Sequence, residues 1–321
     1  MKTNTTQLPS EKQISFDKSW IPPTVPENIA HGDMPGDKVQ INQTHIIKAN
    51  TIFKELMPLL QKEAKQNPYG RVVVTVYGGS GVGKSEIASL LTYYLHAAGI
   101  EGYTLSGDNY PYRIPKYNDA ERIRVFRAGG AQGLVTSGAY TSEISNTLIE
   151  LQKSELDADS NKAAQYPWLS IYQEEGRKAL RGYLGTNCEE NFAQLTEIVS
   201  QFKNGANKIW LKRMGREDTA LWYENVDFTL IKVLVIEWTH GNSDYYQGVD
   251  IPILLNSTPQ ETQEHRKARG RDGKTDSAFT SMVLGLEQQL LQEQSHKAKI
   301  IVEKNGNIIS YEDYRCLMAQ K

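Results

Sequence analysis

The sequence predicts an α/β protein in which a parallel sheet is flanked by helices, and three observations predict it. Residues 72–76 (VVVTV) are β-branched and do not alternate with polar residues, which is typical of a strand buried on both faces. A glycine-rich turn follows, and then apolar residues spaced as on one face of a helix over residues 87–95. Residues 102–106 have the pattern of a second, short strand. Strand, helix and strand in this order form a βαβ unit, in which the two strands run parallel.

The first 66 residues are predicted to form an N-terminal arm and a helix. Up to about residue 45 the chain is polar and contains five prolines, and its main apolar feature is Trp20-Ile21, which would pin the arm to the domain. Residues 46–66 show helical spacing of apolar residues, with Pro58 inside. We assign residues 67–321 to a single domain that starts with the first strand.

A helical insertion is predicted at about residues 128–206 of this domain. Residues 119–206 are mostly helical in pattern, and no strand of the central sheet is evident between 130 and 205.

The remaining strands of the sheet are predicted from short apolar runs. Residues 208–212 indicate a short strand or an ordered loop, and residues 233–236 and 251–255 indicate strands. Ile300-Ile301-Val302 is followed by Asn305-Gly306, a strong signal for a hairpin turn.

Composition excludes several classes of protein. The formal net charge of -2 gives no reason to expect nucleic acid or a membrane surface as a partner. The two cysteines, Cys188 and Cys316, lie far apart, which argues against a disulfide framework or a zinc site. Since the N-terminus lacks an apolar signal region and no apolar run approaches a membrane span, we expect a cytoplasmic protein.

The glycine-rich turn matches a phosphate-binding pattern at every fixed position. Its residues are Gly78, Gly79, Ser80, Gly81, Val82, Gly83, Lys84 and Ser85, which fit G-x-x-x-x-G-K-[ST], the Walker A pattern. Glycines allow successive backbone N–H groups to point at phosphate oxygens, and the following helix adds its positive end. Lys84 would reach the β- and γ-phosphates and the Ser85 hydroxyl would hold Mg²⁺. The sequence therefore predicts a P-loop NTPase-type fold that binds ATP with Mg²⁺.

Two carboxylates are predicted to complete this site. Asp108 follows the second strand, and in a parallel sheet ligands bind beyond the carboxyl ends of the strands. It would accept the proton of a substrate hydroxyl, although an aspartate that only caps a turn is the alternative. Glu237 ends the strand at 233–236, and a buried carboxylate is costly unless it is paired or near a metal. We expect Glu237 to hold Mg²⁺ directly or through water, with a structural hydrogen bond as the alternative.

A basic segment is predicted to close over the triphosphate. Residues 266–271 contain four cations, among which Arg269 and Arg271 are our candidates for phosphate contacts and catalysis together with Lys84 and Asp108. A solvated basic turn would look similar. These parts suit a kinase that transfers the γ-phosphoryl group of ATP to a small acceptor with a hydroxyl group. The guanine-reading N-K-x-D pattern of GTPases is absent from the sequence.

The ordered motifs resemble those of the uridine kinase and phosphoribulokinase family. The likeness covers residues 70–125 and 190–303, and it rests on the glycine loop, Asp108-x-Tyr110, the strand ending in Glu237 and the arginine-rich segment. Trp238 stands where that family has a glycine. Ser106 to Asn109 is also similar to the D-G-D-N step of adenylylsulfate kinases, which is the second reading of the activity.

The acceptor is the least specified part of the prediction. Tyr110, Arg113 and Arg213 are the candidate substrate-binding residues, from two clusters of cations and aromatics that would suit an anionic acceptor. The alternative is that these cations pair with acids on helix surfaces. A different class of function, a nucleotide-dependent switch or scaffold, also stays open, as does assembly into a homo-oligomer.

Overall fold

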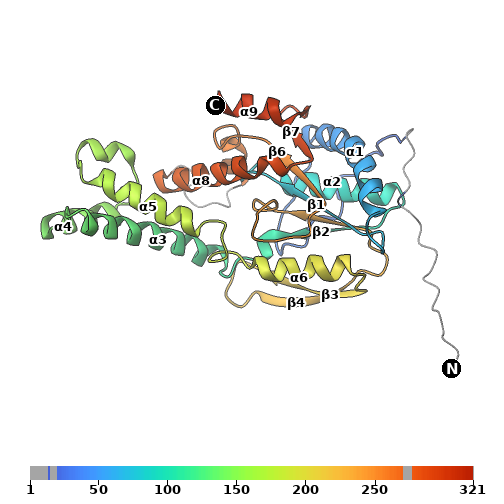
Figure 1. Ribbon diagram of the computed structural model, residues 1–321, viewed down its shortest axis with the longest axis horizontal. Coiled ribbons are helices and arrows are strands. Elements are labelled where there is room, and N and C mark those ends of the chain that lie inside the picture. Colours follow the sequence, from blue (N-terminus) through green and yellow to red (C-terminus); the bar gives the residue numbers. More distant parts are fainter. Residues whose placement is uncertain (1–13, 15–19, 270–276, 321) are drawn as a thin grey trace.

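The computed structural model describes residues 14, 20–269 and 277–320, which form a central six-stranded sheet with helices on both sides (Figure 1). The strand order is β2-β5-β1-β6-β7-β8. The strands are β1 (Val72–Tyr77), β2 (Gly102–Ser106), β5 (Val233–Glu237), β6 (Ile251–Leu255), β7 (Ile300–Val302) and β8 (Ile308–Ile309). All neighbouring pairs are parallel except β7 and β8, which form the hairpin expected at Asn305-Gly306. The predicted fold class is confirmed.

The central strand β1 faces a separate hydrophobic core on each side. Val72, Val74 and Val76 pack with α1 (Gln43–Ala64) and α2 (Lys84–Ala97), whereas Val73 packs with α6 (Phe192–Lys203) beneath the sheet. A strand with both faces buried cannot alternate apolar and polar residues, which explains the continuous β-branched run. Because α1 shares a core with α2, α1 belongs to the same structural unit as the sheet.

The N-terminal segment before α1 runs along this core in an extended form. The Trp20 ring lies 4.5 Å from the Phe53 ring of α1 and 5.4 Å from the Tyr94 ring of α2, measured between centroids. The expectation that Trp20-Ile21 pins the arm to the domain is confirmed for Trp20, whereas Ile21 is 82% exposed.

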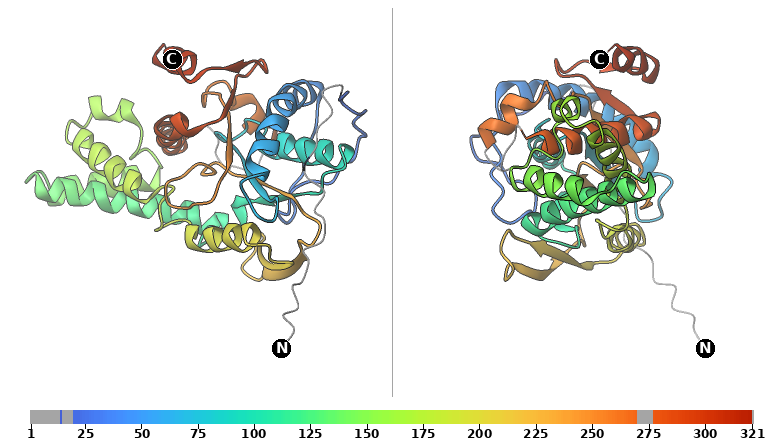
Figure 2. Two further views of the ribbon diagram at one scale, coloured as in Figure 1. Left: turned by 45° about the vertical axis from the view of Figure 1, so that its right-hand side comes forward. Right: turned by 90° about the vertical axis from the view of Figure 1, so that its left-hand side faces the viewer.

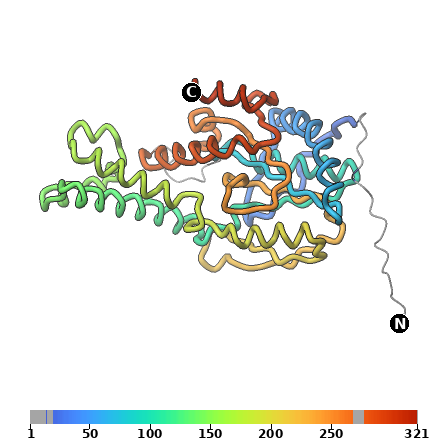
Figure 3. The backbone as a smooth tube through the Cα atoms, in the orientation of Figure 1, coloured from blue at the N-terminus to red at the C-terminus, as the bar shows by residue number. Residues whose placement is uncertain are grey.

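Three helices project beyond the end of the sheet (Figures 1 and 2). They are α3 (Pro115–Thr136), α4 (Ser142–Lys153) and α5 (Leu169–Tyr183), and they share a core with α8 (Ala278–Gln294). Figure 3 follows the backbone out along α3 and back along α5 into α6. Glycines allow the close approach of α3 and α5, since a Cβ on Gly176 would lie 2.6 Å from the Phe126 carbonyl oxygen.

This projection differs from the predicted insertion at 128–206 at both ends. Helix α3 already begins at Pro115, and α6 packs on the sheet instead of extending beyond it. The apolar stripe of α6, which includes Phe192, Leu195 and Phe202, is buried against the sheet because it has the strand residues Val73 and Leu234 as partners.

The remaining elements lie at the edges of the sheet. Strands β3 (Lys208–Met214) and β4 (Leu221–Asp227) form a separate antiparallel hairpin, and the short helix α7 (Gln263–Arg269) and α9 (Tyr311–Ala319) follow β6 and β8. In the described ranges, no helix is both long enough and apolar enough for a membrane span.

Candidate active site

The carboxyl ends of β1, β2 and β5 open into one cavity of about 490 Å³. The register aligns Ser106 at the end of β2 and Val76 of β1 with Glu237 at the end of β5. Lys84, Asp108 and Glu237 therefore line the same cavity although they come from distant parts of the sequence. This is the convergence that the motifs predict.

The glycine loop forms a cradle at one side of the cavity. Gly81 and Gly83 have φ angles of 77° and 94°, which side chains other than glycine rarely adopt. Helix α2 begins at Lys84, so its first N–H groups lie beside the loop. The ammonium group of Lys84 donates to the Gly79 carbonyl at 3.1 Å, which folds the lysine back over the loop. The arrangement suits an anion such as a phosphate.

The Ser85 hydroxyl and the Glu237 carboxylate meet at the floor of the cavity. Ser85 donates to Glu237 Oε2 at 3.2 Å, and Ser106 donates to the other carboxylate oxygen. Burial and the nearby charge of Asp108 raise the pKa of Glu237 to about 8, against the opposing effects of Ser106 and Lys84. A buried carboxylate beside a hydroxyl is an oxygen-rich set of the kind that Mg²⁺ prefers, so the residues fit the expected metal.

Asp108 lies on a tight turn directly after β2. This turn, residues 107–109, packs against the ring of Trp238 so closely that a Cβ on Gly107 would lie 2.1 Å from a Trp238 ring carbon. Because Trp238 occupies the space that a side chain would need, only glycine fits at position 107. This close packing restrains the backbone of the turn that carries Asp108.

The basic segment contributes a different arginine from those predicted. Arg266 of α7 is buried, lines the cavity and contacts the glycine loop, since a Cβ on Gly81 would lie 2.9 Å from its Cγ. Arg269 is the last residue of α7, and the predicted contact through Arg271 lies outside the described residues. Arg266 belongs to the same basic segment, residues 266–271, as the two arginines that were predicted.

The three predicted substrate-binding residues have different surroundings. Arg113 lines the cavity and donates to the Tyr183 hydroxyl at 3.1 Å. Tyr110 is fully buried next to the cavity but not among its lining residues. Arg213 is also buried and does not line the cavity, because its guanidinium pairs with Asp33 at 2.9 Å.

Most of the cations predicted to grip an anionic acceptor are paired with acids. Arg122 contacts Glu189 at 2.6 Å, and Arg127 contacts Asp157 at 3.0 Å. The Arg124 guanidinium pairs with the neighbouring Glu121 on the surface of α3. The Arg124–Glu121 pair follows the alternative reading, in which acids on helix surfaces neutralise these cations, whereas Arg122 and Arg127 pair with buried acids outside α3.

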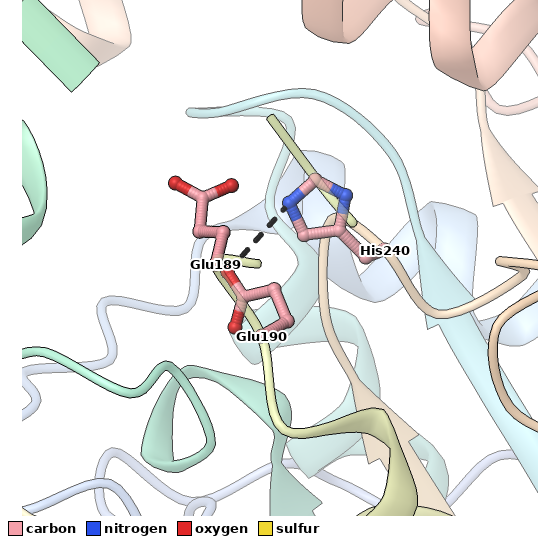
Figure 4. Close-up of side chains that lie close together, drawn as sticks. All are labelled: Glu189, Glu190 and His240. Atoms are coloured by element: carbon pink, nitrogen blue, oxygen red, sulfur yellow. Dashed lines mark ion pairs between the residues drawn. The ribbon is translucent and has the colours of Figure 1, made fainter. Parts of the chain in front are cut away.

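Two further groups of residues at the cavity belong to no sequence motif. The first is Met34, Pro35 and Asp37 of the N-terminal segment, which line the cavity even though the arm has no motif. The second is a buried cluster of Glu189, Glu190 and His240, drawn in Figure 4, in which His240 faces Glu190 at 4.0 Å. Only proximity in the fold brings His240 to residues some 50 positions earlier.

Comparison with known proteins points to kinases. No family model matches the chain. A curated relative from Mediterraneibacter gnavus, the bifunctional alpha-galactosidase/sucrose kinase AgaSK, is 37% identical over 265 residues, which is 83% of this chain and 23% of the relative. The chain thus spans about a quarter of the length of that protein.

The comparison with solved structures finds weaker likenesses, with TM-scores below 0.5. A D-glycerate 3-kinase from Cryptococcus neoformans is 10% identical and covers 83% of this chain and 98% of its own, with a TM-score of 0.45. A protein from Silicibacter described as a fructose transport system kinase is 13% identical and covers 77% of this chain and 93% of its own, with a TM-score of 0.44. Scores this low do not identify a substrate. The fold, the phosphate cradle and the name of the curated relative together confirm the predicted resemblance to P-loop kinases.

Proposed function

We propose that the protein is an ATP-dependent kinase that transfers the γ-phosphoryl group to a hydroxyl of a small metabolite. The observation that carries this proposal is the convergence of Lys84, Asp108 and Glu237 on one cavity. A triphosphate cradle, a base and a carboxylate beside a hydroxyl are the parts that phosphoryl transfer needs in one place.

The residues have distinct parts in this reaction. The glycine loop and Lys84 hold the β- and γ-phosphates, and Arg266 adds positive charge from the other side of the loop. Asp108 accepts the proton of the acceptor hydroxyl as its oxygen forms a bond to the γ-phosphorus. The bond from that phosphorus to the bridging oxygen breaks, and ADP leaves with its electron pair. Ser85 and Glu237 would hold Mg²⁺, which supplies charge neutralisation at the phosphates.

The curated relative supports a sugar as the acceptor. Its name combines an alpha-galactosidase with a sucrose kinase, and a stretch of 265 residues within a chain of 321 has to include the phosphate loop at 78–85. A phosphate cradle serves phosphoryl transfer and has no part in glycoside hydrolysis, which uses a pair of carboxylates. Sucrose is therefore the first acceptor to test.

An ADP-release assay with ATP and Mg²⁺ tests the proposal. The acceptors are sucrose, glucose, fructose, D-glycerate, uridine and adenylylsulfate, and Lys84→Ala protein serves as the inactive control. We expect acceptor-dependent ADP release by the wild type and a phosphorylated product detectable by mass spectrometry. ADP release that is equally fast without any acceptor would favour a nucleotide-dependent switch instead.

A further inference from the structure

The cavity extends from the phosphate cradle to two buried side chains, Glu190 and His240. Glu190 precedes α6 and His240 follows β5, so both are held by the sheet and its covering helix and not by the projecting helices. They are 2% and 6% exposed, and both line the cavity. Within the described part of the chain, Glu190 Oε2 is buried without any hydrogen-bond partner. A buried polar atom without a partner is unfavourable, and Glu190 lines the cavity, where a ligand can supply a partner.

Both side chains favour their neutral forms. Burial raises the pKa of Glu190 well above its ordinary value, and the nearby charges of Glu189 and Asp108 raise it further. Burial also lowers the pKa of His240 to about 4. A neutral carboxyl group and a neutral imidazole can each donate one hydrogen bond and accept another, which matches the hydrogen bonding of a hydroxyl.

Two of the cations near these side chains are paired with acids, and a third, Lys212, donates to the Pro111 carbonyl at 2.8 Å. Arg122, the nearest of them along α3, pairs with Glu189, and Arg127 pairs with Asp157 farther out. Arg216, between β3 and β4, and Arg266 of α7 also line the cavity, and neither has an ion pair within the described ranges. Glu190 and His240 bring no charge that could pair with a buried anion, so this end of the cavity suits an uncharged ligand.

A metal ion is a poor alternative for the cluster. Both carboxylate oxygens of Glu189 are in use, one by Asn118 and Arg122 and the other by the backbone N–H of Gly185 at 2.6 Å. The Arg122 guanidinium, 2.6 Å from Glu189, would also repel a cation. Glu190 and His240 alone are too few protein ligands for a specific site.

We infer that Glu190 and His240 form the acceptor subsite and bind hydroxyl groups of a neutral, polyhydroxylated substrate of the sugar class, an inference that rests on the proposed kinase function. Asp108 lines the same cavity as Glu190 and His240, so the proposed base and the subsite face one bound acceptor. One hydroxyl of the bound sugar then lies toward Asp108 and the γ-phosphate, while others bond to Glu190 and His240.

Two substitutions at Glu190 separate this role from a structural one. Glu190→Gln keeps a neutral donor and acceptor, and Glu190→Met removes both at similar size. We expect Glu190→Met to raise KM for the sugar about 10- to 100-fold with KM for ATP within about twofold, since a buried hydrogen bond to the substrate is lost. Glu190→Gln should stay within about threefold of the wild type. His240→Phe, which keeps the ring beside Trp238, should match the effect of Glu190→Met.

Stability provides the second readout. Replacement of Glu190 by methionine should leave the urea midpoint unchanged or higher, because its buried Oε2 has no internal hydrogen bond to lose. A structural role predicts the reverse: a lower midpoint and an unchanged KM. Glu293→Gln, on an exposed carboxylate of α8 outside the cavity, is the matched control and should change neither.

The acceptor panel distinguishes failure of the subsite from failure of the kinase assignment. Phosphorylation of sucrose, glucose or fructose with the KM pattern above supports the subsite. Phosphorylation of D-glycerate or adenylylsulfate alone overturns the neutral subsite but retains the kinase. A wild-type KM in Glu190→Met also overturns it, and no acceptor-dependent transfer to any compound contradicts the proposed function itself.

Discussion

The carboxylate of Asp33 accepts a hydrogen bond from the backbone N–H of Ser106 at 2.7 Å. The same oxygen accepts from the Asn109 side chain at 3.0 Å, so Asp33 holds the turn on both sides of Asp108. Arg213 completes the arrangement by pairing with Asp33 from β3. Asp33 and Arg213 are not among the residues that line the cavity, so they act on the base through its turn, and Asp33 is a positioning residue.

Asp33→Asn should lower both stability and turnover. The substitution takes one acid partner from the buried Arg213, which keeps Glu224 at 3.0 Å, so we expect a loss of about 1–3 kcal/mol in the free energy of unfolding. A looser Asp108 turn should reduce kcat about tenfold with KM for ATP little changed. Urea denaturation and steady-state kinetics measure both effects. Asp244→Asn, in an exposed ion pair with Lys297, is the control, and an equal effect of the two substitutions would contradict the positioning role.

His240 should make the protein less stable in mild acid. Its pKa is about 4 in the folded protein and about 6.5 when unfolded, so the unfolded chain binds more protons between these values. The contribution of His240 to the free energy of unfolding is fully present above pH 6.5 and is lost as the pH falls toward 4. The loss should approach 3 kcal/mol, at about 1.4 kcal/mol per pKa unit. Urea midpoints at pH 7.5 and 4.5 for the wild type and His240→Phe measure it; parallel pH profiles for the two proteins would refute the assignment.

Gly107→Ala should be destabilising because the added methyl group overlaps Trp238. The overlap, at 2.1–2.5 Å from three Trp238 carbons, cannot be relieved without moving the turn or the ring. Overpacking of this kind typically costs about 1–3 kcal/mol. Trp238→Ala in the same chain should relieve part of that cost, so a double-mutant cycle should show coupling of at least about 0.5 kcal/mol. Additive losses in the free energy of unfolding would mean that the two side chains do not interact.

Ser85→Ala should increase the Mg²⁺ requirement. The hydroxyl lies 3.2 Å from Glu237, and its loss removes one oxygen from the expected metal site. We expect the half-saturating Mg²⁺ concentration for ADP release to rise roughly tenfold or more. Ser89→Ala is the matched control, because that hydroxyl bonds only to the backbone of its own helix. An unchanged Mg²⁺ dependence in Ser85→Ala would exclude its hydroxyl as a metal ligand.

The sequence predicts the cradle and the core of the sheet because local patterns encode them. The glycines of the loop, the β-branched run of β1 and the strand ending in Glu237 are contiguous signals, and a parallel sheet brings their carboxyl ends together. Lys84, Asp108 and Glu237 could therefore be placed at one cavity from the sequence.

The acceptor end of the cavity follows from tertiary contacts that no local pattern encodes. Glu190 has the same sequence context as a helix-start glutamate, and only the fold shows that it is buried against His240. Arg213 lies in a cluster of cations and aromatic residues that is typical of an anion-binding site, but Asp33 from the arm neutralises its charge. The predicted insertion at 128–206 also differs from the observed projection because an amphipathic pattern does not show which surface a helix covers.

Asp108→Asn tests the central claim most directly. The substitution removes the proton acceptor and preserves the shape of the turn, so phosphoryl transfer should fall by about 100-fold or more while ATP binding stays within about twofold. Transfer is measured as acceptor-dependent ADP release, and binding by titration calorimetry with ATP and Mg²⁺. Transfer at the wild-type rate in Asp108→Asn would contradict the account, because the convergence of Asp108 with Lys84 and Glu237 would then have no part in the chemistry.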